Sequence, residues 1–270
     1  MRPIASINQI NKCVSILKTK PKIYGVIPAR MAASRFPGKP LHKIKGKAMI
    51  EHVYIRSMMY KNWDKLVLAT CDDQIINFCN EKKFNSIKTS NKHTRALDRV
   101  AEAAVKIDEN INQNDIVVCV QGDEPMMRPD MIDCVIDPII NNDKIPATVL
   151  AMHITDEKIW RNPDTVKIIH NDNGEVLYTS RSPVPYIKKS FTPELNARRI
   201  YGIFAFRWKE LNEFANHSQT RLEITEACDS NRILDMEFKQ YIAPYRSIKS
   251  FSIGAMVKFS KDNLLFCLFT

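Results

Sequence analysis

The stretch IYGVIPARMAASRFPGKP (residues 23–40) joins a short apolar run to a loop crowded with cations, a hydroxyl and a glycine. The apolar run ends at Pro28 and has the length of a buried strand. KLVLAT (65–70) and DIVVCVQ (115–121) repeat the same kind of run further along the chain. Apolar residues recur at helical spacing between these runs. This alternation predicts parallel βαβ units and an open α/β sheet, whose ligands bind beyond the carboxyl ends of the strands.

The intervening helices are predicted from their apolar stripes. We expect four helices, of which the first carries Met49, Ile50, Val53 and Met58. The second is capped by Asp72 or Asp73 and has Ile75, Ile76 and Cys79 on its inner face. The third, over 96–107, carries Leu97, Val100, Ala104 and Ile107, and the fourth begins at Pro129 and carries Ile132, Val135 and Ile136.

The second half of the chain has a more antiparallel character, typical of a lid or a dimer-forming ribbon. Asn171-Asp172-Asn173-Gly174 is a strong hairpin signal between strands at 165–169 and 175–179. The other predicted elements are strands at 146–154, 201–206 and 238–243 and a single helix at 221–234. We expect residues 1–21 to be an extension of unknown role and residues 22–270 to form one catalytic domain.

Composition narrows the class of protein. The 270 residues are 44% hydrophobic, and no apolar run has the length of a membrane span or of a secretory signal. Seven scattered cysteines without C-x-x-C spacing predict buried free thiols rather than a zinc site. A reducing, cytoplasmic location agrees with them. The net charge of +10 favours anionic partners, but no basic run or aromatic–basic signature indicates nucleic-acid binding.

The loop after residue 28 is the first candidate site. Arg30, Ser34, Arg35 and Lys39 supply the positive charge and donors that a triphosphate needs, because Arg binds phosphate oxygens bidentately. The pattern is neither a Walker loop nor a G-x-G-x-x-G fingerprint. The residue types alone leave open a merely solvated basic loop.

A second candidate follows the 115–121 run as Gln121-Gly122-Asp123-Glu124-Pro125. A carboxylate at the end of a buried strand suits Mg²⁺, which takes one or two carboxylates together with phosphate oxygens. The alternative is a turn in which Asp123 bonds its own backbone.

A third candidate, HTRALDR (93–99), lies where a loop enters a helix, and helix N-termini favour anions. His93 is a candidate ligand contact. The alternatives are a surface histidine and an Arg99 that pairs with Asp98 or Glu102.

Together these segments resemble the CMP-Kdo synthetases (3-deoxy-manno-octulosonate cytidylyltransferases). IPARMAASRFPGKPL and VQGDEPM are very close to that family's N-terminal and central motifs, and NPDTVKII and GEVLYTSRSPVP also follow its pattern. The likeness runs from about residue 22 to 250. It implies a nucleotide-diphospho-sugar transferase fold, which is a Rossmann-like mixed sheet flanked by helices with an antiparallel ribbon in the second half.

The resemblance also implies an activity, the transfer of CMP from CTP to an ulosonic acid with Mg²⁺ by a cytoplasmic homodimer in lipopolysaccharide biosynthesis. It assigns Ala29, Arg30, Ser34, Arg35, Lys39, His93 and Arg99 to the nucleotide, Gln121, Arg181, Glu223 and Glu226 to the sugar acid, and Asp123 to the metal, with Arg30, Lys39 and Asp123 catalytic.

The chain departs from the family pattern in three places. The family's Ser-Gly-Thr is missing between His93 and Arg99. A sugar-contacting His and a Tyr align with Ile200 and Phe204. The late segment that supplies a second metal-binding Asp aligns near Gly254, where no Asp is present. Asp262 and Asp235 are candidate replacements, and an altered sugar pocket suggests a different, amino-substituted ulosonic acid.

Three rival interpretations remain open at this stage. One is a CMP-nonulosonate (sialic-acid-type) synthetase, whose N-terminal loop differs from RFPGKPL. Another is a non-catalytic nucleotide-binding relative, which the Gly254 departure favours. The third is a nucleic-acid-binding protein, which the +10 charge alone suggests.

Overall fold

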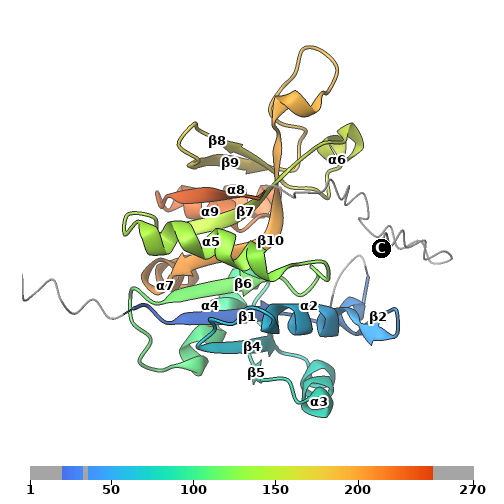
Figure 1. The fold of residues 1–270 in the computed structure, drawn as a ribbon, viewed down its shortest axis with the longest axis vertical. Coiled ribbons are helices and arrows are strands. Elements are labelled where there is room, and N and C mark those ends of the chain that lie inside the picture. Colours follow the sequence, from blue (N-terminus) through green and yellow to red (C-terminus); the bar gives the residue numbers. More distant parts are fainter. Residues whose placement is uncertain (1–19, 33–35, 246–270) are drawn as a thin grey trace, which may run out of the picture.

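The computed structural model of the protein describes residues 20–32 and 36–245. Within this part of the chain a nine-stranded mixed sheet forms the centre (Figure 1). Its strands are β1 (Ile23–Pro28), β4 (Lys65–Thr70), β5 (Ser86–Lys88), β6 (Ile116–Val120), β7 (Ala147–His153), β8 (Lys167–His170), β9 (Val176–Ser180), β10 (Arg198–Arg207) and β11 (Gln240–Tyr245). A small separate hairpin consists of β2 (Lys43–Ile44) and β3 (Lys47–Ala48).

Seven strands follow one another in the order β11-β7-β10-β6-β1-β4-β5, and β8 and β9 form a ribbon attached to β10. β1 pairs in parallel with β4 and β6, and β10 runs antiparallel between β6 and β7. The expected parallel units are therefore confirmed. The carboxyl ends of β1, β4 and β6 meet at one edge, where the loops of the candidate site begin.

Helices cover both faces of the sheet (Figure 1). One face carries α2 (Met49–Met58), α3 (Asp73–Lys82) and α5 (Pro129–Asn141), and the other carries α4 (Ala96–Ile107), α7 (Trp208–Asn216) and α9 (Ser230–Asp235). The remaining helical segments are α6 (Glu157–Arg161), α8 (Arg221–Glu226) and the 3-10 turns η1 (Lys39–Leu41) and η2 (Pro193–Leu195).

The central strands β1 and β6 are buried along their whole length, as strands covered on both faces are. In β1, Ile23 and Ile27 pack into the core shared with α2, α3 and α5. Tyr24 and Val26 point to the opposite face and join the core of α4 and α7, as the two-residue period of a strand requires. All six residues of β1 are buried, which explains the unbroken apolar run in the sequence.

Three helix predictions need correction. Met58, expected on an inner face, is 53% exposed because it lies at the end of α2. Asp72 precedes α3 but does not cap it with its side chain; the carboxylate accepts a hydrogen bond from Met31 N instead. The single helix expected over 221–234 is two helices, α8 and α9, because Ala227 adopts a left-handed conformation (φ 49°) that ends the first.

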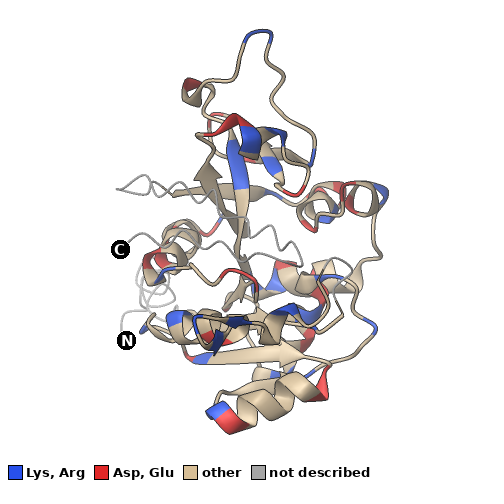
Figure 2. Ribbon diagram, turned by 90° about the vertical axis from the view of Figure 1, so that its right-hand side faces the viewer, with Lys and Arg blue, Asp and Glu red and all other residues tan. Residues whose placement is uncertain are grey.

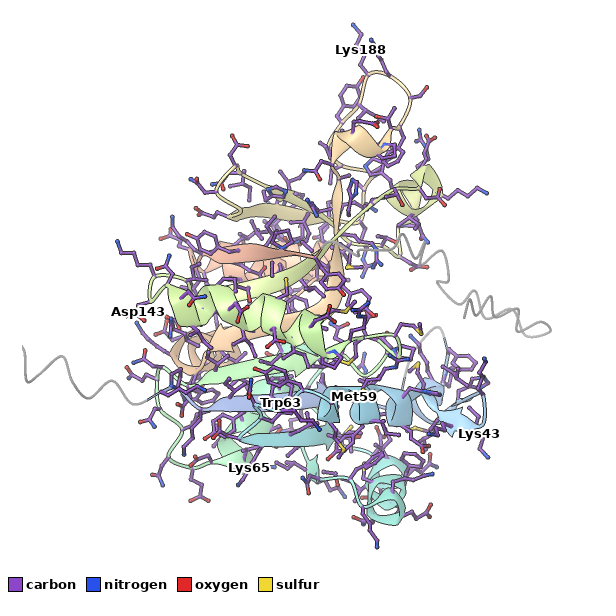
Figure 3. The ribbon with its side chains drawn as sticks, viewed as in Figure 1. Lys43, Met59, Trp63, Lys65, Asp143 and Lys188 are labelled. Carbon is purple, nitrogen blue, oxygen red and sulfur yellow. The ribbon has the colours of Figure 1, made fainter. Side chains whose placement is uncertain are left out.

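The hairpin prediction is confirmed. β8 and β9 pair antiparallel, and Asn171 Oδ1 accepts from the backbone N–H groups of Asn173 and Glu175 in the turn. Beyond β9 the chain makes a projecting loop, with Lys188 at its tip far from Lys65 of β4 (Figure 3). A small cluster of Ile154, Trp160 and Ala197 packs beneath this loop.

Candidate functional site

The loop that follows β1 is tied down at three points. Ala29 N donates to Ala69 O at 2.9 Å, which keeps the loop entrance beside the end of β4. Met31 N donates to Asp72 Oδ2 at 2.8 Å, and Gly38 N donates to Met31 O at 3.0 Å and closes the loop on itself. Ala29 is buried, whereas Arg30 is exposed at the sheet edge. Ser34 and Arg35, the other expected phosphate contacts, lie outside the described residues.

The loops after β1 and β6 meet at this edge. Lys39 Nζ lies 2.9 Å from Asp123 Oδ2, although 84 positions separate the two residues in the sequence. Gly122 makes the approach possible, since a Cβ there would lie 2.8 Å from the Pro28 carbonyl oxygen. Lys39 and Asp123 keep 30% and 47% of their side-chain surface exposed. The pair is therefore accessible to a ligand, and in solvent it contributes little stability by itself.

Gln121 and Glu124, on either side of Asp123 in the sequence, both lie against β10. Gln121 N donates to Gly202 O at 2.8 Å, and Gly202 N donates to Glu124 Oε1 at 3.1 Å. A Cβ on Gly202 would come within 2.9 Å of Gln121 Cβ and 3.0 Å of Glu124 Cγ. Only glycine at 202 therefore lets both side chains occupy these positions.

Glu124 has an unusual acidity. Burial, followed by the neighbouring negative charge of Asp123, raises the pKa of Glu124 to about 7, although the Gly202 N–H and the Arg199 charge oppose the shift. Near neutral pH this carboxyl group is thus partly protonated.

The segment before α4 is held by Glu102 and Arg99. Glu102 accepts hydrogen bonds from Ser90 N and Lys106 Nζ and also pairs with His93 Nε2. Arg99 is only 3% exposed, and its Nη1 donates to Thr89 Oγ1 and Ser90 O. The expected pairing of Arg99 with Asp98 or Glu102 is not what the structure has. Arg99 supports the segment from inside rather than lying on its surface.

Glu223, expected to contact the sugar acid, lies in a buried ion pair. It is completely buried, and its two carboxylate oxygens accept hydrogen bonds from Arg232 Nε and Nη2, both at 2.7 Å. Arg232 also donates to Asp98 of α4 at 2.7 Å, so the pair joins α8 and α9 to α4. In the described part of the chain Glu223 therefore has a buried, structural contact, and its expected role toward the sugar acid stays a prediction.

Arg181 and Glu226, by contrast, lie together at the end of β9. Glu226 accepts from Arg181 N, Tyr178 Oη and Ser180 Oγ, each at 2.8 Å. The Arg181 guanidinium donates from Nε to Glu226 O at 2.8 Å and from Nη1 to Pro163 O at 2.9 Å. The hydrogen bonds from Arg181, Tyr178 and Ser180 outweigh the effect of burial and lower the pKa of Glu226. The carboxylate is therefore ionised and rigidly oriented.

Burial, together with the negative charges of Asp229 and Asp123, raises the pKa of the Cys119 thiol in β6. Asp235, one candidate second metal ligand, is exposed at the end of α9; Gly254 and Asp262 lie outside the described residues.

Residues 20–32 and 36–245 contain no group of three or more His, Cys, Asp or Glu side chains arranged for a metal ion. A single exposed carboxylate, Asp123, is nevertheless compatible with Mg²⁺, because this ion commonly takes one or two carboxylates and completes its shell with water and substrate phosphates. The donor chemistry at the end of β6 thus fits Mg²⁺ bound together with a phosphorylated ligand.

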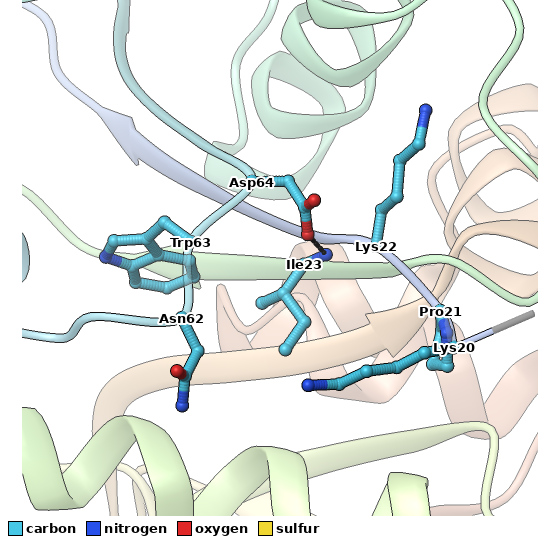
Figure 4. Close-up of a pocket in the computed structure, with 7 residues that line it drawn as sticks. All are labelled: Lys20, Pro21, Lys22, Ile23, Asn62, Trp63 and Asp64. Atoms are coloured by element: carbon cyan, nitrogen blue, oxygen red, sulfur yellow. Dashed lines mark hydrogen bonds between the residues drawn. The ribbon is translucent and has the colours of Figure 1, made fainter.

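Other surfaces offer weaker candidates. A hollow of about 300 Å³ is lined by Lys20, Lys22, Trp63 and Asp64 (Figure 4), at the amino end of β1, opposite the edge that carries Asp123. In the described part of the chain, basic and acidic positions both occur along the lower helices and in the upper part of the fold (Figure 2). Among the described helices, none has both the length and the apolar character needed to cross a bilayer.

Two residues that matter for this arrangement escaped the sequence analysis. Asp72 holds the loop after β1, and Lys167 of β8 bonds the carbonyl oxygen of Arg181. The sequence predicts Asp72 as a helix cap, which is the usual role of Asp before a helix. Lys167 lies in a strand pattern that gives a lysine no special role. Neither long-range contact leaves a local signal.

Comparison with known proteins gives consistent matches. A family model described as "Cytidylyltransferase" matches residues 24–241. A 3-deoxy-manno-octulosonate cytidylyltransferase of Thermodesulfovibrio yellowstonii is 36% identical over 221 residues, which cover 79% of this chain and 86% of the relative. The enzyme of that name from Saccharophagus degradans is 34% identical and covers 81% and 88%, respectively.

Solved structures agree with these matches. The structure of CMP:2-keto-3-deoxy-manno-octonic acid synthetase complexed with CTP superposes with a TM-score of 0.75 and 29% identity, and the match covers 84% of this chain and 90% of that one. A 4-diphosphocytidyl-2C-methyl-D-erythritol synthase from Anaerococcus prevotii matches with a TM-score of 0.53 at 16% identity, which supports the fold alone.

Proposed function

The chain belongs to the cytidylyltransferase family, and from this membership we propose that it transfers CMP from CTP to 3-deoxy-manno-octulosonate (Kdo) or a related ulosonic acid. In this reaction the anomeric hydroxyl oxygen attacks the α-phosphorus of CTP. A new P–O bond forms, the bond to the β-phosphate oxygen breaks, and pyrophosphate leaves. Such a transfer depends mainly on positioning and on neutralising phosphate charge.

The contact between Lys39 and Asp123 is the observation that carries the proposal. It brings a cationic loop and a carboxylate together at the carboxyl edge of the sheet, where open α/β sheets bind ligands. Lys39 Nζ is free to exchange its contact with Asp123 for the phosphates of CTP, where it would stabilise charge on the departing pyrophosphate. Exposed Arg30 lies at the same edge, and Ser34 and Arg35 belong to the same loop.

We assign the other residues around this edge. Ala29 and His93 would contact the nucleotide, and buried Arg99 would shape the Thr89–Ser90 segment beside it. Gln121 and Arg181 would bind the sugar acid, with Glu226 orienting Arg181. Asp123 would hold Mg²⁺, which when bound supplies charge neutralisation to the phosphates.

The Kdo-type assignment rests on relatives that carry this name at 34–36% identity over about four-fifths of the chain. By the resemblance, Ile200 and Phe204 stand where the family has a sugar-contacting His and a Tyr, so these differences would alter the choice of sugar acid rather than the reaction. An amino-substituted ulosonic acid therefore remains a second candidate substrate, and a panel of sugar acids tests it. A clear preference for plain Kdo would contradict the second candidate.

The deciding experiment measures pyrophosphate release by the purified protein with CTP, Mg²⁺ and Kdo. We expect release by the unaltered chain and a loss of about 100-fold or more in Asp123→Ala, since removing one charge-stabilising group commonly costs that much. Asp130→Ala is the matched control. Asp130 is an equally exposed carboxylate paired with Arg128 at 3.0 Å, and the proposal gives it no role in the site.

Each outcome of this experiment has a clear meaning. CTP binding without pyrophosphate release with any sugar acid would indicate a non-catalytic relative, the alternative raised by the missing Asp near Gly254. Release with a nonulosonic acid but not with Kdo would indicate the sialic-acid type. Equal losses in Asp123→Ala and Asp130→Ala would contradict the role of Asp123.

The homodimer and the cytoplasmic location are further proposals. The homodimer is proposed from the resemblance of the sequence to the CMP-Kdo synthetases. The described cysteines are free thiols, which supports a reducing compartment. Light scattering of the purified protein tests the dimer.

A further inference from the structure

Lys167 is a buried lysine with an unusual environment. Its side chain has no exposed surface, and its ammonium group donates to three backbone carbonyl oxygens, those of Asn162 (2.9 Å), Thr165 (2.6 Å) and Arg181 (2.5 Å). An ammonium group has three donors, so all of them are used. Lysine is rarely buried completely, because desolvation of the charge is costly unless its partners compensate. No described carboxylate bonds to Lys167, so backbone dipoles supply the compensation.

Each of the three acceptor carbonyl groups belongs either to Arg181 itself or to the turn that its guanidinium group contacts. Asn162 and Thr165 begin and end a turn in which Thr165 N also donates to Asn162 O at 3.1 Å. Pro163 lies inside this turn, and its carbonyl oxygen accepts from Arg181 Nη1. Lys167 thus binds both the turn that receives the guanidinium and the backbone of Arg181 itself.

The opposite side of Arg181 is held by α8. Arg181 N donates to Glu226 Oε2, and the Nε and Nη2 atoms donate to the carbonyl oxygens of Glu226 and Ala227. The Arg181 peptide group is therefore fixed at its N–H by Glu226 and at its carbonyl by Lys167. The pairing of Lys167 with Ser180 across β8 and β9 brings the ammonium group to this position.

We propose that Lys167 is a positioning residue for Arg181, whose orientation toward the sugar acid it sets through the 162–165 turn and the Arg181 carbonyl. This inference rests on the proposed function, because it takes Arg181 as a contact to the sugar acid. It assigns Lys167 no contact with CTP and none with the reacting atoms. Loss of the ammonium group therefore weakens sugar-acid binding and leaves nucleotide binding unchanged.

The charges around Lys167 agree with an ammonium group that backbone carbonyl dipoles hold in place. Burial, followed by the positive charge of Arg181, lowers the pKa of Lys167 to about 8, and Glu226 acts in the opposite direction. Two cations lie close to each other, and the carbonyl oxygens between them offset their repulsion. A side chain without donors at 167 would remove these hydrogen bonds from Thr165 O and Arg181 O and loosen the link between the turn and Arg181.

The test compares Lys167→Met with Arg207→Met. Arg207 is a second buried cation, which donates to the carbonyl oxygens of Ile139 and Asn142 at the opposite edge of the sheet. We expect Lys167→Met to raise KM for Kdo at least about 10-fold, the factor that corresponds to 1.4 kcal/mol, with KM for CTP within about twofold. Arg207→Met should lower Tm without separating the two KM values.

A double-mutant cycle sharpens the comparison. In an Arg181→Ala background, Lys167→Met should add nothing further to KM for Kdo, because both substitutions remove the same oriented guanidinium. A KM for Kdo that stays unchanged in Lys167→Met would overturn the proposal. Equal rises in both KM values, or additive effects in the cycle, would also overturn it and indicate a purely structural role.

Hydrogen exchange separates this inference from the proposed function. If the unaltered chain releases no pyrophosphate, the proposed function fails, but the exchange rate of the Arg181 amide still reports its orientation. We expect faster exchange at Arg181 in Lys167→Met and no change in Arg207→Met. Unchanged exchange would overturn the positioning role. Lys167→Gln, which retains two donors, serves the same measurements if Lys167→Met does not fold.

Discussion

Single residues at the end of β6 decide how the site is shaped. Gly202 of β10, which lies beside the end of β6, illustrates this, because Gln121 and Glu124 both lie where its side chain would be. The sequence shows only a glycine within an apolar strand pattern. The structure shows that this glycine lets the 121–124 turn lie against β10. Asp123 is thereby directed toward Lys39 instead of toward the sheet.

We predict that Gly202→Ala displaces Gln121, because the new Cβ would lie 2.9 Å from Gln121 Cβ. Overpacking of this kind costs about 1–3 kcal/mol. We expect a lower Tm and a raised KM for the sugar acid in steady-state assays. Gly25→Ala is the matched control, since it overpacks against Leu66 and Trp63 in β1 away from the site. Identical kinetic changes in both variants would contradict a local effect.

Contacts between helices and loops hold the segments next to the proposed nucleotide site. Glu102 of α4 holds the chain after β5 through Ser90 and His93, and Arg232 joins α9 to both α8 and α4. The contact of Arg232 with Asp98 joins helices that are distant in the sequence. The contacts of Glu102 with Ser90 and of Glu223 with Arg232 join residues on either side of a turn. The segment before α4 therefore depends on ion pairs that pH can remove.

We predict an acid-dependent loss of stability at Glu102. Burial acts to raise its pKa, but hydrogen bonds from Lys106, Ser90 N and His93 prevail and lower it from 4.5 to about 2. Because the folded-state pKa is the lower one, the contribution is complete above pH 4.5 and is lost as pH falls from there toward 2.

Denaturant unfolding at several pH values checks this prediction. Glu102→Gln should lower the free energy of unfolding at pH 7 by roughly 1–3 kcal/mol, at about 1.4 kcal/mol per pKa unit with allowance for partial exposure. The difference from the unaltered chain should shrink as pH approaches 3. Glu81→Gln, at an exposed position of α3, is the control. A difference that is constant with pH would rule out the ionic origin.

At the scale of the whole molecule, the site draws on separate parts of the sheet. The loops after β1 and β6 lie at the carboxyl edge of the sheet, where we propose that the nucleotide binds, and the β8–β9 ribbon with α8 carries Arg181 and Glu226. A ligand that bridges these parts stabilises the folded chain as a unit. Such stabilisation is a measurable property even when turnover is slow.

We predict that CTP with Mg²⁺ raises Tm. At a concentration 100 times the dissociation constant, binding adds about 2.7 kcal/mol, which corresponds to roughly 5–10 °C for a domain of this size. Differential scanning fluorimetry with ATP as the comparison nucleotide measures the effect. No shift with CTP in the unaltered chain, or the same shift with ATP, would contradict a cytidine-selective site.

The sequence by itself determined the alternating strands and helices, the hairpin at 171–174, the free thiols and the two loops that end at Lys39 and Asp123. These features are local, since apolar period, turn chemistry and strand length are written in neighbouring residues. The tertiary structure decided which residues meet. It buried Glu223 in an ion pair with Arg232 and divided the predicted 221–234 helix into two at Ala227. It also placed buried Lys167 beneath Arg181. Such contacts depend on packing between segments that are distant in the sequence. The sequence does not predict them, because the fold, and not the neighbouring residues, determines which side chains meet.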